Sequence, residues 1–133
     1  MTPGNLPLSI QRNTPYLPDT IDFEGYDFSA ATFAMQVRSR RGATGDPLIS
    51  LTNQTAGTEG LSVTTSESEG VTTSHLQIQI DEATIDAVLP ASTNGQKAGT
   101  DVVLYYDLVI TDAATGKHRW IEGTFTIFEG VTV

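Results

Sequence analysis

Few side chains in this sequence are of the kinds that carry out covalent catalysis. The only histidines are His75 and His118, and there is no cysteine. Nucleophilic catalysis needs a serine, threonine or cysteine beside a base, but the sequence lacks the Gly-x-Ser-x-Gly turn that presents such a serine. His75 starts an alternating segment and His118 follows a predicted turn, which is typical of solvent-facing histidines. We therefore predict that the protein is not an enzyme.

Carboxylates are plentiful, but their spacing is not that of a catalytic or metal-binding set. Asp81, Glu82 and Asp86 group at a predicted helix start, where negative charge complements the helix dipole. Glu67 and Glu69 form only a pair, and no stretch matches a calcium-binding EF-hand loop. There is also no glycine-rich phosphate-binding loop. We expect no metal ion and no cofactor.

The charge balance argues against a polyanionic partner. The chain has 133 residues with seven Lys or Arg and 16 Asp or Glu, which gives a formal net charge of −9. Nucleic acids and anionic membranes attract basic proteins, so we expect neither as a partner. No apolar run approaches the ~18 residues of a membrane-spanning helix, and residues 1–10 lack the features of a signal peptide. We expect synthesis in a cytoplasm.

Three features of the sequence suit contact with another protein. The stretch 38–41 holds the only basic cluster, which either forms salt bridges with a partner's acidic surface or is a solvated loop. Aromatic residues are predicted on the outer face of the last hairpin, and contiguous apolar surface usually has a partner. Residues 130–133 continue a strand pattern that can add to a neighbour's sheet edge. The candidate contact residues are Tyr105, Trp120, Phe128, Arg38, Arg40, Arg41, Val131 and Val133.

The elements that must position these residues are strands. Twenty of the residues are Thr, which is stiff at χ1 and fits a pleated surface. Short alternating segments between Gly and Pro predict many strands in two packed sheets. The fold class expected is all-β, a mainly antiparallel β-sandwich of about eight strands. The predicted strands are 6–10, 20–23, 32–38, 48–52, 61–65, 75–80, 102–111 and 117–128.

The remaining segments divide the chain further. Residues 1–18 are predicted to be an extended N-terminal segment that lies along a partner, and residues 19–133 a single β-sandwich domain. Residues 66–74 are predicted to be a polar loop, and residues 81–89 one short helix that Pro90 ends. The predicted core consists of Phe33, Met35, Val37, Leu76, Ile78, Leu104, Tyr106, Leu108, Phe125 and Ile127.

Four segments occur in an order that resembles a group of small virion proteins of tailed phages and prophages. They are IDFEGYDFSAATFAMQVRSRRG (21–42), PLISLT (47–52), HLQIQIDEATIDAVLP (75–90) and YYDLVITDAATGKHRWIEGTFTI (105–127). The sequence is similar to the N-terminal domain of the phage baseplate upper protein family over about residues 20–128. The most specific parts of the resemblance are Tyr106-Asp107-Leu108 and Glu122-Gly123.

The resemblance implies an immunoglobulin-like β-sandwich with a structural role and no enzymatic activity. It implies an adaptor in the tail tip or baseplate that joins neighbouring virion proteins or anchors receptor-binding fibres. The partners would be other virion proteins, in repeated copies of a symmetric assembly, and the protein would reside in the virion after synthesis in the bacterial host cytoplasm. The sequence departs from the family in stopping at Val133 and in its longer, more polar segment 53–74.

Two other functions stay open on the residues alone. A carbohydrate-binding module that contacts host glycan would stack sugar rings on Trp120, Tyr105, Tyr16 and Tyr26. A head decoration or head-fibre protein would use the same fold at another position of the virion. A glycan-binding signal at Trp120 would favour the first, and co-fractionation with the capsid would favour the second.

Overall fold

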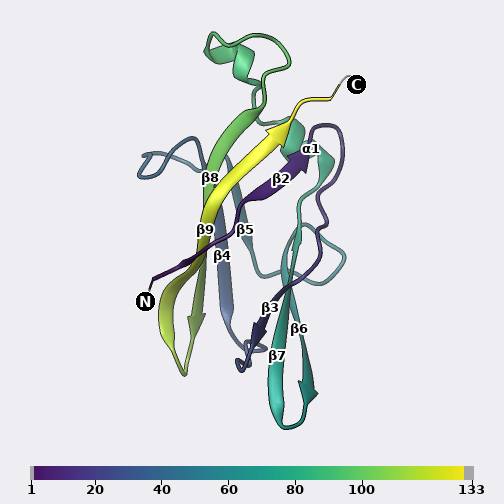
Figure 1. The fold of residues 1–133 in the computed structure, drawn as a ribbon, viewed down its shortest axis with the longest axis vertical. Coiled ribbons are helices and arrows are strands. Elements are labelled where there is room, and N and C mark those ends of the chain that lie inside the picture. Colours follow the sequence, from purple (N-terminus) through teal and green to yellow (C-terminus); the bar gives the residue numbers. More distant parts are fainter. Residues whose placement is uncertain (1, 131–133) are drawn as a thin grey trace.

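The computed structural model describes residues 2–130, and about half of them belong to nine strands (Figure 1). Two short helical segments, α1 (Glu82–Asp86) and the 3₁₀ turn η1 (Ala91–Asn94), connect β7 to β8. The strands are β1 (Gly4–Asn5), β2 (Leu8–Gln11), β3 (Ile21–Glu24), β4 (Thr32–Arg38), β5 (Ile49–Thr52), β6 (Gly60–Ser68), β7 (Val71–Gln79), β8 (Val102–Asp112) and β9 (Gly116–Phe128).

The strands form two sheets that pack face to face. One sheet has six strands in the order β1-β9-β8-β4-β5, with β2 also paired to β9, and the other has the order β3-β7-β6. All pairings are antiparallel except those of β1 and β2 with β9. The predicted all-β sandwich with one short helix between residues 81 and 89 is therefore confirmed. Asp81 precedes that helix, but its side chain makes no capping hydrogen bond.

The ten residues predicted to form the core are all buried. None of them is more than 5% exposed, and they lie on the inner faces of both sheets. They were identifiable because a half-buried strand alternates apolar and polar residues with a period of two. Phe28 and Ile85 join the same core from outside the strands.

The N-terminal segment belongs to the sandwich. β2 runs parallel to β9, with Leu8 opposite Phe125 and Ile10 opposite Ile127. Leu8 and Ile10 are 8% and 1% exposed, so they complete the core. The expectation that residues 1–18 lie along a partner is therefore wrong for β1 and β2, because both strands pair with β9 and the apolar side chains of β2 pack within this chain.

The predicted polar loop 66–74 is instead the end of a hairpin. β6 and β7 pair as far as Ser68 opposite Val71. Glu69 and Gly70 form the turn, with φ angles of 52° and 81°, as a two-residue hairpin turn of the primed type requires. Alternation is missing near the turn because residues 64–71 are exposed on both faces.

Candidate contact site on the six-stranded sheet

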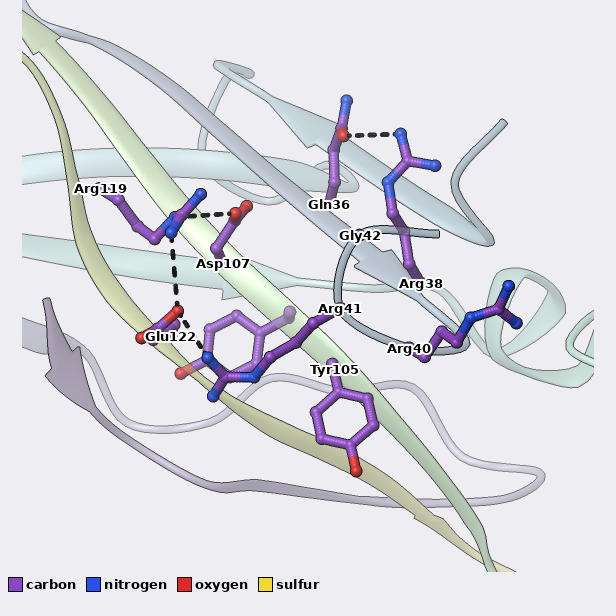
Figure 2. A pocket seen from close by; sticks show the side chains of 10 residues that line it. Gln36, Arg38, Arg40, Arg41, Gly42, Tyr105, Asp107, Arg119 and Glu122 are labelled. Atoms are coloured by element: carbon purple, nitrogen blue, oxygen red, sulfur yellow. Dashed lines mark hydrogen bonds and ion pairs between the residues drawn. The ribbon is translucent and has the colours of Figure 1, made fainter. Parts of the chain in front are cut away.

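An open pocket of about 230 Å³ lies on the outer face of the six-stranded sheet, the face turned away from β3, β6 and β7 (Figure 2). Strands β4, β8 and β9 form its floor, and the loop 39–46 after β4 forms one wall. The pocket is lined by Gln36, Arg38, Arg40, Arg41, Gly42, Tyr105, Tyr106, Asp107, Arg119 and Glu122. The three predicted arginines and Tyr105 therefore meet in one site.

Arg38 fixes the loop that carries the other two arginines. It lies opposite Tyr105 in the β4–β8 ladder, and its Nη1 donates hydrogen bonds to the carbonyl oxygens of Gly45 at 2.6 Å and Ala43 at 3.3 Å. A turn that starts at Arg40 is closed by the Ala43 amide, which donates to the Arg40 carbonyl at 3.3 Å. The loop therefore presents its guanidinium groups from an ordered backbone.

Two carboxylates hold arginines at the floor of the pocket. Asp107 and Glu122 face each other across β8 and β9, a pairing of like charges that is destabilising by itself. Arg119 relieves it with its Nε 3.1 Å from Asp107 and its Nη1 3.9 Å from Glu122. Arg41 adds an Nη1 contact at 3.3 Å to Glu122. Asp107 and Glu122 therefore both form ion pairs with arginines on this face.

The pocket concentrates positive charge on an acidic protein. Its four arginines are more than half of the seven Lys and Arg residues in the chain, and only two carboxylates oppose them. Within residues 2–130, the Arg40 side chain has no hydrogen bond or ion pair, and the Arg41 side chain is 65% exposed. Arginine binds carboxylates through two parallel N–H bonds. The pocket therefore suits an acidic side chain or another carboxylate.

Trp120 does not lie on the outer face, which corrects the sequence prediction. The β8–β9 register shifts at Leu108 and Val109, so that Ile121 and Arg119 have partners on β8 and Trp120 is the extra residue of a bulge. The bulge turns the indole inward, where it makes edge contacts with Phe23 and Phe28 at centroid distances of 5.8 and 5.3 Å. A sugar-stacking role for Trp120 therefore loses its structural basis.

The remaining predicted contact residues have different outcomes. Phe128 ends β9 and is half-buried on the outer face, where it accepts a backbone hydrogen bond from Arg12 at 2.9 Å. It does not line the basic pocket. Val131 and Val133 lie outside the described residues.

A hydrogen-bonded row on the other sheet was missed by the sequence analysis. His75 Nδ1 lies 2.7 Å from Asp22 Oδ1, and its Nε2 lies 2.8 Å from Ser66 Oγ. The hydrogen bond from His75 lowers the pKa of Asp22. No local pattern in the sequence indicates it, because only the pairing of β3, β7 and β6 places these residues on one face.

This row has the connectivity of a nucleophile, a base and an orienting acid. Acyl transfer also needs donors aimed at a developing oxyanion. The amides around His75 and Ser66 are directed along the sheet by the ladders, so they do not point out of the face on which the Ser66 hydroxyl lies. We interpret the row as a cross-strand tie.

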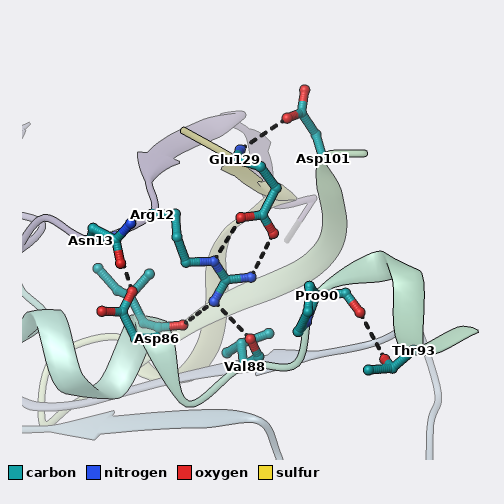
Figure 3. Close-up of polar contacts among 9 residues, drawn as sticks. Arg12, Asn13, Asp86, Val88, Pro90, Thr93, Asp101 and Glu129 are labelled. Carbon is teal, nitrogen blue, oxygen red and sulfur yellow. Dashed lines mark hydrogen bonds and ion pairs between the residues drawn. The ribbon is translucent and has the colours of Figure 1, made fainter. Parts of the chain in front are cut away.

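A second polar cluster joins the two ends of the chain to the helical segment (Figure 3). Arg12 Nε and Nη2 donate to the two carboxylate oxygens of Glu129 at 2.9 and 2.8 Å. Its Nη1 donates to the carbonyls of Ile85 and Val88 at 2.9 and 2.7 Å. Arg12 and Glu129 are 10% and 12% exposed, and Arg12 lowers the pKa of Glu129. This cluster is built as a clamp in which each of the three guanidinium nitrogens of Arg12 donates at least one hydrogen bond.

No other group of chemically active side chains stands out in the part of the chain that the structure describes. Among residues 2–130, no three His, Asp or Glu side chains are grouped so that they could hold a metal ion. None of the helices described is long and apolar enough to cross a membrane.

No protein-family model matches the sequence, and no curated protein matches it.

Proposed function

We propose that the protein is a non-enzymatic structural protein of a tailed-phage virion. In this role it is an adaptor in the tail-tip or baseplate region that joins neighbouring virion proteins or anchors receptor-binding fibres. The resemblance of residues 20–128 to the baseplate upper protein family motivates the proposal. The basic pocket is the observation that carries it, because it is an ordered, partly unneutralised contact site on an otherwise acidic protein.

The strand order supports the immunoglobulin-like part of the proposal. An immunoglobulin variable-type sandwich has strands G, F, C and C′ in one sheet and B, E and D in the other. Here β9-β8-β4-β5 face β3-β7-β6, and their succession along the chain is the same. Such sandwiches bind partners through sheet faces and end loops, which is where the pocket and loop 39–46 lie.

The geometry supports a protein partner. Exposed arginines on an acidic protein attract an acidic surface, and this attraction both guides encounter and selects the partner. Each contact can be weak when many copies act together in a symmetric assembly. The pocket gives one such contact per chain.

The proposal is tested in purified phage particles. Electron cryomicroscopy of the intact virion should locate the chain at the tail tip or baseplate. The double substitution Arg40→Glu and Arg41→Glu should lower its copy number in particles, whereas Lys97→Glu and Lys117→Glu, which change the net charge equally at exposed positions outside the pocket, should not. Location of the chain in the capsid, or absence from particles, would overturn the adaptor role.

A further inference from the structure

The β6–β7 hairpin extends beyond the body of the sandwich (Figure 1). Its last pair with a third strand is Thr73 opposite Glu24, and β6 and β7 continue alone to Ser68 and Val71. Every residue from 64 to 71 is exposed. A two-stranded ribbon is marginal in water without a third strand or a packed face. The extension therefore contributes little to the stability of this chain, and its surface is accessible to another molecule.

The tip of this hairpin is acidic. Glu67 and Glu69 lie within three residues of each other, and the chain has no Lys or Arg between Arg41 and Lys97. Neither glutamate side chain has a hydrogen bond or ion pair among the described residues, and both residues are exposed. The tip thus presents carboxylates that no cation of its own neighbourhood neutralises.

Glu69 occupies a backbone position that its residue type does not favour. Its φ of 52° lies in the left-handed region, where Gly, Asn and Asp are the usual residues of a primed turn. Other residues there cost of order 1 kcal/mol. A glutamate at this position gives up turn stability and places a long carboxylate at the outermost point of the hairpin.

We propose that the acidic tip of one copy docks in the basic pocket of a second copy. Glu67 and Glu69 would bind Arg40 and Arg41, the two guanidinium groups that the chain itself leaves most accessible. A second copy is favoured over other acidic partners because this chain carries both complementary parts, one on each sheet. The inference rests on the proposed function only in treating the pocket as a protein contact.

The contact must form between copies. The pocket and loop 39–46 belong to the six-stranded sheet, while the tip belongs to the other sheet and lies at the end of the sandwich opposite α1 (Figure 1). Tip and pocket are different surfaces, so the contact is heterologous. Such a contact repeats head to tail and forms a ring when the rotation closes.

Charge reversal of purified full-length chains tests the contact. In low salt, where exposed charges are least screened, sedimentation velocity should show concentration-dependent association of the wild type. Glu67→Arg with Glu69→Arg, and separately Arg40→Glu with Arg41→Glu, should each weaken association at least ~10-fold because like charges then meet across the interface. Lys97→Glu with Lys117→Glu should associate like the wild type.

Mixing the two reversed proteins gives the sharper result. In the mixture each reversed tip meets a pocket of opposite charge, so association should return although neither protein associates alone. Unfolding of a variant cannot produce this rescue. Failure of the mixture to associate while the wild type does would overturn the tip-to-pocket contact.

Cross-linking detects the contact even when it is weak. The chain has no cysteine, so Glu69→Cys and Arg40→Cys variants can be mixed and joined by a short bismaleimide. Heterodimers should exceed those from the control pair Glu82→Cys and Arg40→Cys, since Glu82 is exposed beside α1. Equal yields would overturn the inference. If Arg40→Glu with Arg41→Glu still blocked incorporation into particles, the adaptor proposal would stand with a different acidic partner in the pocket.

Discussion

Arg12 is the residue that ties the most distant parts of the chain together. Its guanidinium group bonds to Glu129 near the end of β9 and to the carbonyls of Ile85 and Val88 after the helical turn (Figure 3). Five donors in a rigid fork suit this task, which a lysine could not perform. Because both charges are largely buried, each is stabilised by the other in place of water.

Replacement of Arg12 by Met should destabilise the protein by about 3–5 kcal/mol, because Glu129 is then left buried without its partner. Urea denaturation followed by circular dichroism measures the loss. Arg119→Met is the matched control, since its ion pair is about half exposed and should contribute no more than about 1 kcal/mol. Equal losses of unfolding free energy for the two variants would contradict the stabilising role of the Arg12–Glu129 pair.

Glu129 should make the stability of the protein depend on pH. Its pKa in the folded protein is lowered from 4.5, first by the hydrogen bond from Arg12. A carboxyl group with a lowered folded pKa stabilises the fold above its unfolded pKa, and this contribution is lost as the pH falls through the folded pKa.

Wild-type protein should therefore be more stable than Glu129→Gln at neutral pH, and the difference should shrink as the pH falls below about 4.5. Urea unfolding of both proteins between pH 3 and 7 gives the comparison. Glu82→Gln, an exposed site, serves as control. A difference that stays constant over this range would show that Glu129 acts through packing alone.

At the scale of elements, β9 organises the sandwich. It pairs with β1, β2 and β8, and its bulge at Trp120 turns one aromatic ring into the space between the sheets. The same bulge places Arg119 on the outer face beside Glu122. One irregularity therefore supplies both an inner contact and part of the basic pocket.

Gly123 lets the N-terminal segment cross β9 closely. A Cβ at this position would lie 2.6 Å from the carbonyl oxygen of Leu6, which is closer than real contacts allow. The same segment is held by a hydrogen bond from the Leu6 amide to the Glu122 carbonyl at 2.9 Å. The missing side chain of Gly123 is therefore what allows the N-terminal backbone to come so close.

Gly123→Ala should therefore displace β1 and the connection to β2, at a cost of about 1–3 kcal/mol. In the Gly123→Ala variant, hydrogen exchange should become faster at the Leu6 and Ile10 amides than at the amides of β8. Thr124→Ala, a neighbouring change on the opposite face of β9, should leave the exchange of both amides unchanged. If amide exchange instead became faster by the same factor throughout the protein, the lost stability of Gly123→Ala would not come from displacement of the N-terminal segment.

At the scale of the whole molecule, residues 2–12 are part of the folding unit. They contribute Leu8 and Ile10 to the core and Arg12 to the clamp. Without them Phe125 and Ile127 would lose their neighbours on β2. Removal of this segment would therefore destabilise the fold. A defect in assembly after such a truncation would not by itself show that a contact with a partner had been lost.

Deletion of residues 1–12 should lower the thermal midpoint by more than Arg12→Met does, because both apolar burial and the clamp are lost. A synthetic peptide of residues 4–13 should restore part of the midpoint by adding back the missing strand. A peptide with Leu8 and Ile10 replaced by Ser is the control. A truncated chain that unfolds at the wild-type temperature would show that the segment is dispensable.

The sequence alone determined the strands and the core. Phe33, Met35 and Val37 alternate with polar neighbours, and the period of two along a half-buried strand is a local property that needs no knowledge of partners. The long hairpin of β8 and β9 was predictable for the same reason. The exposed end of the β6–β7 hairpin was not, because a strand without a buried face has no alternation to read.

The tertiary structure decided the site. β4 and loop 39–46 are far in sequence from β8 and β9, and only pairing in one sheet brings Arg41 beside Glu122 and Arg38 beside Tyr105. The inward turn of Trp120 depends on a one-residue register shift between β8 and β9, which reverses the face of a side chain. Register and long-range pairing are set by the balance of packing over the whole sandwich, so the local pattern around these residues could not specify them.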